Sequence, residues 1–251
     1  MTLTDLFQHW PIIPLFALVA MLYSSVGHGG ASGYLALLSL FGLASPSSSA
    51  VVLVLNILAA SIGFIAFRQA GYFSFKKLLP FIVGSVPAAF VGASIKLSPQ
   101  LFSITLGVAL LLAAIRILFL REIKSREKIV SERMLWQWGI PIGVVLGLLS
   151  GMVGIGGGVF LSPILLFMRW ADVRETAALA SAFIVINSLS GLVGHLATET
   201  IPLQATLLLS GVVLVGAIIG SQLGALKIRP LRIQTVLGVV LLTASVKLLL
   251  K

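Results

Sequence analysis

The sequence predicts an all-α, multi-pass membrane protein, and its composition and hydropathy are the observations that predict it. Of the 251 residues, 59% are hydrophobic and 10% are charged, and the mean hydropathy is +1.14. A soluble domain needs about 25% charged residues to cover its surface. A soluble fold of about this length also buries only about three quarters of its surface. So much apolar sequence therefore calls for lipid as its solvent.

Apolar segments divide the chain into two halves of five. In the first half we expect them at 11–27, 29–43, 48–68, 76–96 and 99–120. In the second half we expect them at 134–153, 156–168, 175–197, 202–225 and 230–250. Three segments in each half approach or exceed the ~20 residues that cross a bilayer core. The first two of each half are interpreted as shorter arms joined at glycines. This gives a first repeat at 1–120, a charged linker at 121–133 and a second repeat at 134–251.

The two halves also resemble each other residue by residue. Residues 26–30 (VGHGG) match residues 153–157 (VGIGG), which lie 127 positions further along the chain. Asn56 matches Asn187, 131 positions further along, after a four-residue insertion. Because such matches are collinear over a whole half, they indicate an internal duplication.

Positive residues give the expected orientation, since short cytoplasmic loops are enriched in Lys and Arg. The linker 121–133 and the gap near 227–232 are basic, and Arg68, Lys76 and Lys77 flank the gap near 69–75. The gaps 44–47 and 198–201 carry no Lys or Arg. We therefore expect the linker to be cytoplasmic and the protein to lie in the cell membrane. The two halves would then start on opposite sides, as in the inverted-topology repeats of many secondary transporters.

Each pair of short arms meets at a glycine cluster. Glycine accepts positive φ and close backbone approach, so these clusters favour tight turns over helix. Arms of about 15 residues would reach about 22 Å, past the midplane of a core about 30 Å thick. Irregular backbone at that depth is tolerated only when it is buried in protein or lines a wet cavity. We therefore expect the two turns to meet near the centre of the membrane.

The second arm of each pair begins at its turn, which suggests an anion site. Its N-terminus would present unpaired N–H groups and about half a positive charge. Two such ends would bind an anion without a buried Lys or Arg, and serine hydroxyls and asparagine amides would complete the site. The candidate substrate-binding residues are Ser24, Ser25, Gly27, His28, Gly29, Gly30, Ser32, Asn56, Ser150, Gly154, Gly156, Gly157, Gly158 and Asn187.

Structural roles are alternative hypotheses for these residues. Glycine pairs in membrane helices often serve close packing, and we expect that role for small-residue faces elsewhere, at Ala88 and Gly92 and at Gly216, Gly220 and Gly224. The alternative role for the two asparagines is hydrogen bonding between helices. His28 is a donor to the anion, a carrier of a coupled proton or a neutral structural residue. His195, near the outer end of its segment, is expected at the membrane interface.

The glycine motifs resemble those of the sulfite exporter TauE/SafE family. The resemblance rests on residues 151–158 (GMVGIGGG), followed by 161–163 (LSP), and on the related residues 27–30 (GHGG). It extends over essentially the whole chain. It implies a multi-pass permease of the plasma membrane for sulfite or organosulfonate-type anions. The first turn departs from the second at His28, where the second turn has Ile155.

The function predicted from these features is secondary transport of a small sulfur-containing oxyanion by alternating access around the two turns. A passive anion channel would use the same turns. A third hypothesis is an intramembrane serine protease, in which Ser32 within residues 30–33 (GASG) would pair with His195 as base. With no cysteine in the chain, disulfides and thiolate metal sites are excluded.

The expected partners follow from the transporter hypothesis. They are a small anionic substrate and the lipid bilayer, with a coupling proton or sodium ion and a homodimer left open. We expect no enzyme activity, cofactor, metal or nucleic-acid partner. The first ten residues show no signal-peptide pattern, so we expect no cleaved leader.

Overall fold

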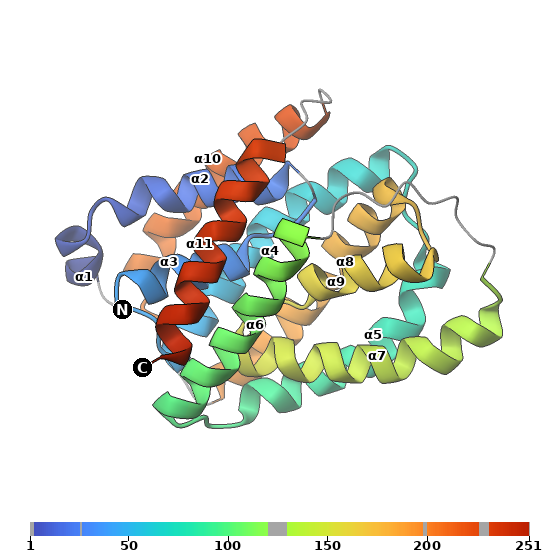
Figure 1. Cartoon of the computed structure of the whole chain (residues 1–251), viewed down its shortest axis with the longest axis horizontal. Helices are drawn as coiled ribbons and strands as arrows, with labels where there is room; N and C mark the ends of the chain where they lie inside the picture. The colour runs from blue at the N-terminus through green and yellow to red at the C-terminus, as the bar shows by residue number, and fades with distance from the viewer. Residues whose placement is uncertain (1–2, 26, 120–129, 198–199, 226–230, 251) are drawn as a thin grey trace.

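The computed structural model describes residues 3–25, 27–119, 130–197, 200–225 and 231–250, and these residues are helical with short connections (Figure 1). Most of the expected linker 121–133 and part of the basic gap near 227–232 lie outside them. The helices are α1 (Leu3–Gln8), α2 (Ile12–Ser24), α3 (Ala31–Leu40), α4 (Pro46–Gln69), α5 (Phe75–Ser94), α6 (Pro99–Phe119), α7 (Glu132–Val153), α8 (Gly158–Met168), α9 (Val173–Leu196), α10 (Leu203–Ala225) and α11 (Leu231–Leu249).

The all-α, membrane-spanning class is confirmed. Within the described residues, five helices are long and apolar enough to cross a bilayer, namely α4, α5, α7, α9 and α10. Their outward faces are also apolar. Val145, Val193 and Leu207 are 56%, 58% and 63% exposed. Large aliphatic side chains at these positions suit contact with lipid, because lipid replaces the polar cover that water would require.

One expectation about the short arms is wrong. Helices α2, α3 and α8 are short, with 13, 10 and 11 residues, but α7 has 22 residues and is long enough to span the bilayer. It begins two residues before the expected segment, where the Ser131 side chain accepts a hydrogen bond from the Met134 N–H at 3.3 Å. This serine cap draws the end of the charged stretch into the helix.

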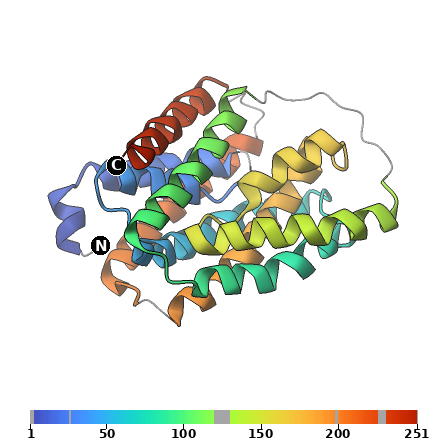
Figure 2. The same ribbon diagram turned by 60° about the horizontal axis from the view of Figure 1, so that its bottom comes forward.

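Helices α5 and α7 run parallel and in close contact, side by side in both views (Figures 1 and 2). Glycine recurs at every fourth residue of α7, so that one face of the helix carries no side chain. A Cβ atom added at any of these positions would collide with α5, mostly with its backbone carbonyls. The four are Gly139, Gly143, Gly147 and Gly151. This stripe was not singled out in the sequence, although it is the closest helix contact described.

Helices α2 and α10 form the corresponding pair, since α2 is the counterpart of α7 in the sequence match and α10 is the counterpart of α5. A Cβ atom on Gly216 would meet the Ala17 carbonyl, and one on Gly220 would meet the Met21 carbonyl. The order of these contacts makes the two helices parallel. The expected packing roles of Gly92, against α7, and of Gly216 and Gly220 are confirmed. The side-chain surroundings of Gly224 lie outside the part that the structure describes.

The remaining long helices pack against their own counterparts. Leu53 of α4 lies against Gly191 of α9, and Asn56 bonds Ser188 of α9 at 3.0 Å, so the two helices run antiparallel. Helices α6 and α11 also lie side by side in opposite directions (Figures 1 and 2). There, the Ser245 hydroxyl of α11 donates to the Gly107 carbonyl of α6 at 2.8 Å. The principal helix contacts thus recur when each helix is exchanged for its counterpart in the other half.

Candidate functional site

The first turn joins α2 to α3. Gly27 and Gly30 have φ angles of 76° and 105°, in the left-handed region that favours glycine. The His28 N–H donates to the Tyr23 carbonyl at 2.9 Å, which closes the end of α2. The predicted break in the helix is confirmed, and it leaves His28 and Gly29 at the tip of the hairpin.

The second turn joins α7 to α8 in the same manner. Gly154, Gly156 and Gly157 have φ angles of 82°, 77° and 74°. The Gly154 and Ile155 N–H groups both donate to the Ser150 carbonyl, at 2.8 and 3.2 Å. The two equivalent glycine clusters therefore form equivalent turns.

The two turns meet at the side chain of Asn56. A Cβ atom added at Gly29 or at Gly156 would collide with the Asn56 amide, so a turn lies directly against each of these two faces. The Asn56 Nδ2 donates to the Ile155 carbonyl at 3.3 Å and to the Ser188 hydroxyl at 3.0 Å. Its Oδ1 accepts the Ala31 N–H at 3.2 Å. One asparagine thus bonds both hairpins.

The depth of this contact follows from the position of Asn56 in α4. Helix α4 has 24 residues, from Pro46 to Gln69, and Asn56 lies within two residues of its middle. At 1.5 Å per residue that is about 2–3 Å from the centre of the longest helix in this half. The turns therefore meet halfway along helices long enough to span the membrane.

His28 makes a second link between the halves. Its Nε2 lies 2.9 Å from the Ser162 hydroxyl of α8, and that hydroxyl donates to the Gly158 carbonyl at 3.0 Å. A hydroxyl has one hydrogen to donate, so Ser162 bonded to Gly158 is matched by an Nε2 that donates to Ser162. His28 is 4% exposed between the first turn and the second hairpin.

The candidate serines divide into two groups. Ser25 donates to the Leu22 carbonyl of its own helix at 2.7 Å, and Ser32 pairs with the Tyr23 hydroxyl at 2.6 Å. These two are satisfied within the first hairpin. Ser24 and Ser150 are buried, and neither hydroxyl has a hydrogen-bond partner within the described residues. They retain a donor for a ligand.

Asn187, the counterpart of Asn56, is bonded differently. Its Nδ2 donates to the Phe183 carbonyl of its own helix at 2.9 Å. Its Oδ1 has no hydrogen-bond partner in the part of the chain that the structure describes, and the residue is 0% exposed. The sequence match pairs the two asparagines 131 positions apart, but α4 and α9 begin 127 positions apart, and Ile184 rather than Asn187 packs on Gly158 at the start of α8. Of the two asparagines, only Asn56 bonds both turns.

The first N–H groups of the second arms are not unpaired, contrary to the expectation. The Ala31 N–H is bonded to Asn56, and the Gly158 N–H donates to the Gly156 carbonyl at 3.0 Å.

Helix α3 is held at its other end as well, because the Lys247 ammonium donates to the Ser39 and Leu40 carbonyls at 3.0 and 2.8 Å. A cation at a helix C-terminus is stabilising.

Several residues of the site were missed in the sequence. Ser188 bonds Asn56 and Ser162 bonds His28. Ser49 of α4 donates to the Val153 carbonyl at the end of α7, at 2.9 Å. The Tyr34 hydroxyl donates to the Gly29 carbonyl at 3.0 Å. Ser188 follows Asn187 directly, and Ser162 belongs to the LSP segment, so both were adjacent to residues already singled out; Ser49 and Tyr34 carried no comparable signal.

The geometry contradicts the serine protease hypothesis. Ser32 pairs with Tyr23, whereas the His195 Nε2 lies 3.0 Å from the Gly151 carbonyl of α7. The two residues therefore do not form a nucleophile and base. His195 is 5% exposed and packs against α7, one residue before the end of α9, and its place at the membrane interface stays a prediction.

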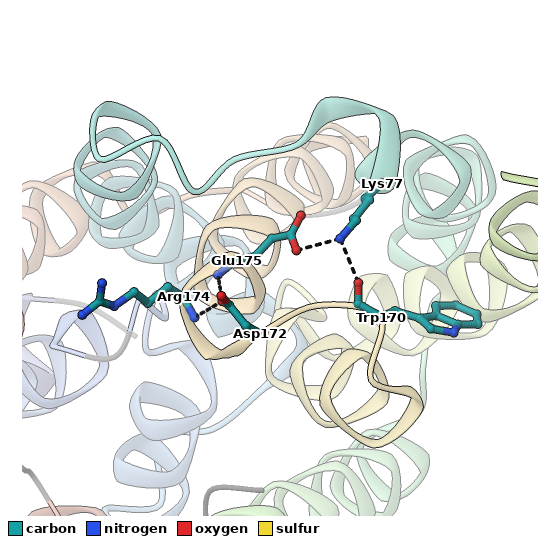
Figure 3. A network of polar contacts seen from close by, with 5 residues as sticks. All are labelled: Lys77, Trp170, Asp172, Arg174 and Glu175. Atoms are coloured by element: carbon teal, nitrogen blue, oxygen red, sulfur yellow. Dashed lines mark hydrogen bonds and ion pairs between the residues drawn. The ribbon is translucent and has the colours of Figure 1, made fainter. Parts of the chain in front are cut away.

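Charged side chains gather at the ends of helices, away from the turns. The Lys77 ammonium donates to Glu175 at 2.7 Å and to the Trp170 carbonyl at 3.0 Å, and Asp172 caps α9 by accepting the Arg174 and Glu175 N–H groups (Figure 3). The start of α5 and the start of α9 therefore lie at the same end of the molecule. Within the described residues, no three or more His, Asp or Glu side chains come together as a metal site.

Comparisons with known proteins identify the family. The profile described as "Sulfite exporter TauE/SafE" matches residues 12–248. The chain is 31% identical to the probable membrane transporter protein y4hK of Sinorhizobium fredii, over 93% of this chain and 95% of the relative. It is 27% identical to the probable membrane transporter protein YjnA of Bacillus subtilis, over 95% and 98%. No solved structure matches. The chain is a multi-pass membrane transporter, not an enzyme, and it belongs to the sulfite exporter TauE/SafE family.

Proposed function

We propose that this protein is a secondary transporter that moves a small sulfur-containing oxyanion, of the sulfite or organosulfonate class, by alternating access. The anion is held where the two glycine turns meet. The observation that carries the proposal is the contact of both turns with Asn56, halfway along α4. The family match supports the substrate class, because the family is described as one of sulfite exporters.

The two repeats, 1–120 and 134–251, are inverted relative to each other in this proposal. Two observations support it. Helices α4 and α9, which are counterparts, run antiparallel, and so do α6 and α11. A membrane protein whose halves had the same orientation would carry such counterparts in parallel. The basic linker 121–133 then faces the cytoplasm, as does the basic start of α5. The start of α9 lies at the same end, because Lys77 of α5 pairs with Glu175 of α9.

The anion binds through neutral groups. The N-termini of α3 and α8 carry partial positive charge, and the Ser24 and Ser150 hydroxyls are available as donors. In the described conformation, Asn56 Oδ1 accepts the hydrogen bond of the Ala31 N–H. The anion replaces this oxygen, and so releases Asn56 from the first turn. Binding is thereby coupled to the contact between the halves.

Two closely packed helix pairs are the bodies that move. In each pair the glycines bring the backbones into contact, α7 on α5 and α2 on α10, and each pair contains the first arm of one hairpin. Rocking of one pair against the other would open the space between the turns to one side of the membrane at a time. This is the rigid-body motion typical of repeat-built transporters.

The first test is a matched pair of glycine substitutions in purified protein reconstituted into liposomes. Gly29→Ala forces a methyl group onto the Asn56 amide, whereas Gly211→Ala meets nothing within 4 Å. We expect Gly29→Ala to lose at least about tenfold in sulfite flux, since misplacement by about 1 Å at a site is enough to do so. Gly211→Ala should keep the wild-type flux. Equal flux in both variants would remove the turns from the site.

The channel hypothesis is tested in the same liposomes. With a carrier, unlabelled sulfite inside the liposomes accelerates the uptake of labelled sulfite, and the uptake saturates as the external sulfite concentration rises. A channel shows neither behaviour. We expect saturable counterflow, and unsaturable flux that follows the voltage would favour the channel.

A further inference from the structure

Both glycine turns are closed off in the described conformation. Residues 27–30 and 153–158 are buried. In an alternating-access transporter, the segments that cover such a site move aside on one side of the membrane at a time. The contacts of the two turns identify these covering segments.

The N-terminal end of α9 covers the first turn. A Cβ atom on Gly27 would lie 3.0 Å from the Ala177 Cβ of α9 and 2.6 Å from a ring carbon of Phe67, two residues before the end of α4. Residues 172–177, the α9 cover, extend from this contact to the end of the molecule at which α5 and α9 begin.

The N-terminal end of α4 covers the second turn in the same way. A Cβ atom on Gly154 would lie 2.7 Å from the Ser49 Cβ, and the Ser49 hydroxyl donates to the Val153 carbonyl at 2.9 Å. Residues 45–50 form this α4 cover. Because α4 and α9 run antiparallel, the two covers lie at opposite ends of the molecule.

Two links that involve charged side chains hold the α9 cover in place. The Lys77 ammonium of α5 donates to Glu175 at 2.7 Å and to the Trp170 carbonyl at 3.0 Å (Figure 3). The Arg174 guanidinium donates to the Tyr72 hydroxyl, and its Cζ lies 5.2 Å from the centre of the Tyr72 ring. Lys77 and Tyr72 belong to the first half of the chain, so both links tie that half to the α9 cover.

The α4 cover contains no charged residue. The residues 127 positions before Arg174 and Glu175 are Ser47 and Ser48, and α10, the counterpart of α5, contains no charged residue either. The Ser48 hydroxyl donates to the Ser45 carbonyl at 2.6 Å, within the cover itself. The two covers therefore differ in the interactions that must break before they open.

Helices α5 and α9 are joined through backbone at their far ends and through side chains at their starts. A Cβ atom on Gly194 of α9 would meet the Phe90 carbonyl of α5 at 2.7 Å, so the two backbones lie against each other there. At the starts, the Lys77 and Glu175 side chains are 22% and 15% exposed. Water can replace each partner when the starts separate, so this pair is suited to repeated breaking.

From this asymmetry we propose that Lys77 and Glu175, together with Arg174 and Tyr72, form the gate that closes the first turn from the end where α5 and α9 begin. The ion pair breaks whenever the α9 cover opens, whereas the α4 cover opens without separating charges. In the proposed topology this gate faces the cytoplasm. The inference rests on the proposed alternating access and adds the residues that control one of its two openings.

A cysteine reporter in the first hairpin tests the gate, because the chain has no other cysteine. Ser24→Cys places a thiol at the end of α2, where the serine is 2% exposed. In inside-out membrane vesicles, Glu175→Gln should make this thiol react about fivefold faster with a membrane-impermeant methanethiosulfonate, since the rate follows the population of the open state. In right-side-out vesicles the rate should not rise. Glu132→Gln, the same change in an exposed residue at the start of α7, should leave both rates unchanged.

Charge exchange separates a gate from a general loss of stability. Lys77→Glu alone places two carboxylates together and should open the same side. Lys77→Glu combined with Glu175→Lys should return the rate towards that of the wild type, because opposite charges again face each other. A double variant that reacts as fast as Lys77→Glu alone would overturn the pairing.

The labelling rates need no substrate, so they separate the gate from the proposed function. Unchanged labelling in Glu175→Gln, or an equal rise from both sides, would overturn the gate even if sulfite counterflow is present. If the wild type moves no anion in liposomes, the proposed function fails instead.

Discussion

At the residue scale, Asn56 carries the contact between the two halves. Its side chain makes three hydrogen bonds, to Ala31, Ile155 and Ser188, from a position that is 1% exposed. Polar side chains in the middle of a membrane helix are retained where they bond other helices or a ligand. In the described conformation, Asn56 bonds other helices. In our proposal, it releases the Ala31 N–H when the anion binds.

Asn187 of α9 supplies a control for this residue. Asn56→Ala and Asn187→Ala remove the same atoms, but the first loses three hydrogen bonds to other segments and the second loses one bond to its own helix. We expect Asn56→Ala to be less stable than Asn187→Ala by about 2 kcal/mol. This corresponds to about 4–8 °C in Tm for a chain of this size, measured by thermal unfolding in detergent. Equal Tm values would mean that Asn56 does not join the halves.

The sequence located this residue but not its bonds. The glycine clusters predicted the two turns, since five glycines there adopt positive φ, and the position of Asn56 in both repeats marked it as a candidate. That Asn56 would bond both turns, while Asn187 would bond only Phe183, depends on how the two halves dock. The same holds for the pairing of His28 with Ser162, 134 residues away. Local pattern carries no information about such docking.

At the element scale, the stability of the fold depends on helices whose backbones touch. The α7 glycine stripe lies against α5 with no room for a methyl group. Close approach of this kind is the main source of helix association in a membrane, where lipid removes the hydrophobic driving force between helices. The glycine spacing was readable in the sequence, but the partner helix was not, because α5 is separated from α7 by α6 in the chain.

Two glycine-to-alanine substitutions test this packing, and we expect them to change the stability of the protein in opposite directions. Gly147→Ala should push α7 away from the Ser85 backbone and destabilise the protein by about 1–3 kcal/mol. Gly211→Ala, on a helix face with nothing within 4 Å, should be neutral or stabilise by up to about 1 kcal/mol, because alanine favours helix. Thermal unfolding of the two variants checks this. A Gly147→Ala variant as stable as Gly211→Ala would refute the contact.

Helix α3 is too short to span the membrane and is held at both ends. Lys247 bonds its last carbonyls, Ser39 and Leu40. Lys247→Met keeps the apolar stem but removes these bonds, so we expect α3 to loosen. Faster amide hydrogen exchange in residues 31–40, with unchanged exchange in α5, would be the result. Unchanged exchange in α3 would mean that the lysine is not a cap.

At the scale of the whole molecule, the proposed alternating-access mechanism depends on two halves that face opposite sides of the membrane. The absence of cysteine makes this testable with single labels. Ser47 and Arg174 occupy equivalent positions, 127 residues apart, near the starts of α4 and α9. With inverted halves, Ser47→Cys should react with a membrane-impermeant maleimide from outside intact cells, and Arg174→Cys only after lysis. Labelling of both from the same side would contradict the inverted topology.

Composition predicted the membrane class, and the glycine repeats predicted the hairpins. The length of α7 was not predicted, because its Ser131 cap extends the helix into a charged stretch. The first arm of the second hairpin is therefore longer than that of the first. The two hairpins are equivalent at their turns and unequal in their first arms. A repeat detected in sequence thus gives the positions of equivalent residues, and tertiary packing decides whether they behave alike.

The most direct test of the central claim is anion binding to the purified protein, followed as a shift in its unfolding temperature. At about one hundred times the Kd, a ligand adds about 2.7 kcal/mol of stability. In mildly acidic buffer, hydrogen sulfite should raise the Tm of the wild type and of Gly211→Ala. It should leave unchanged the Tm of Gly156→Ala, whose methyl group would fill the contact between the second turn and Asn56. A Gly156→Ala variant stabilised as much as the wild type would contradict binding between the turns.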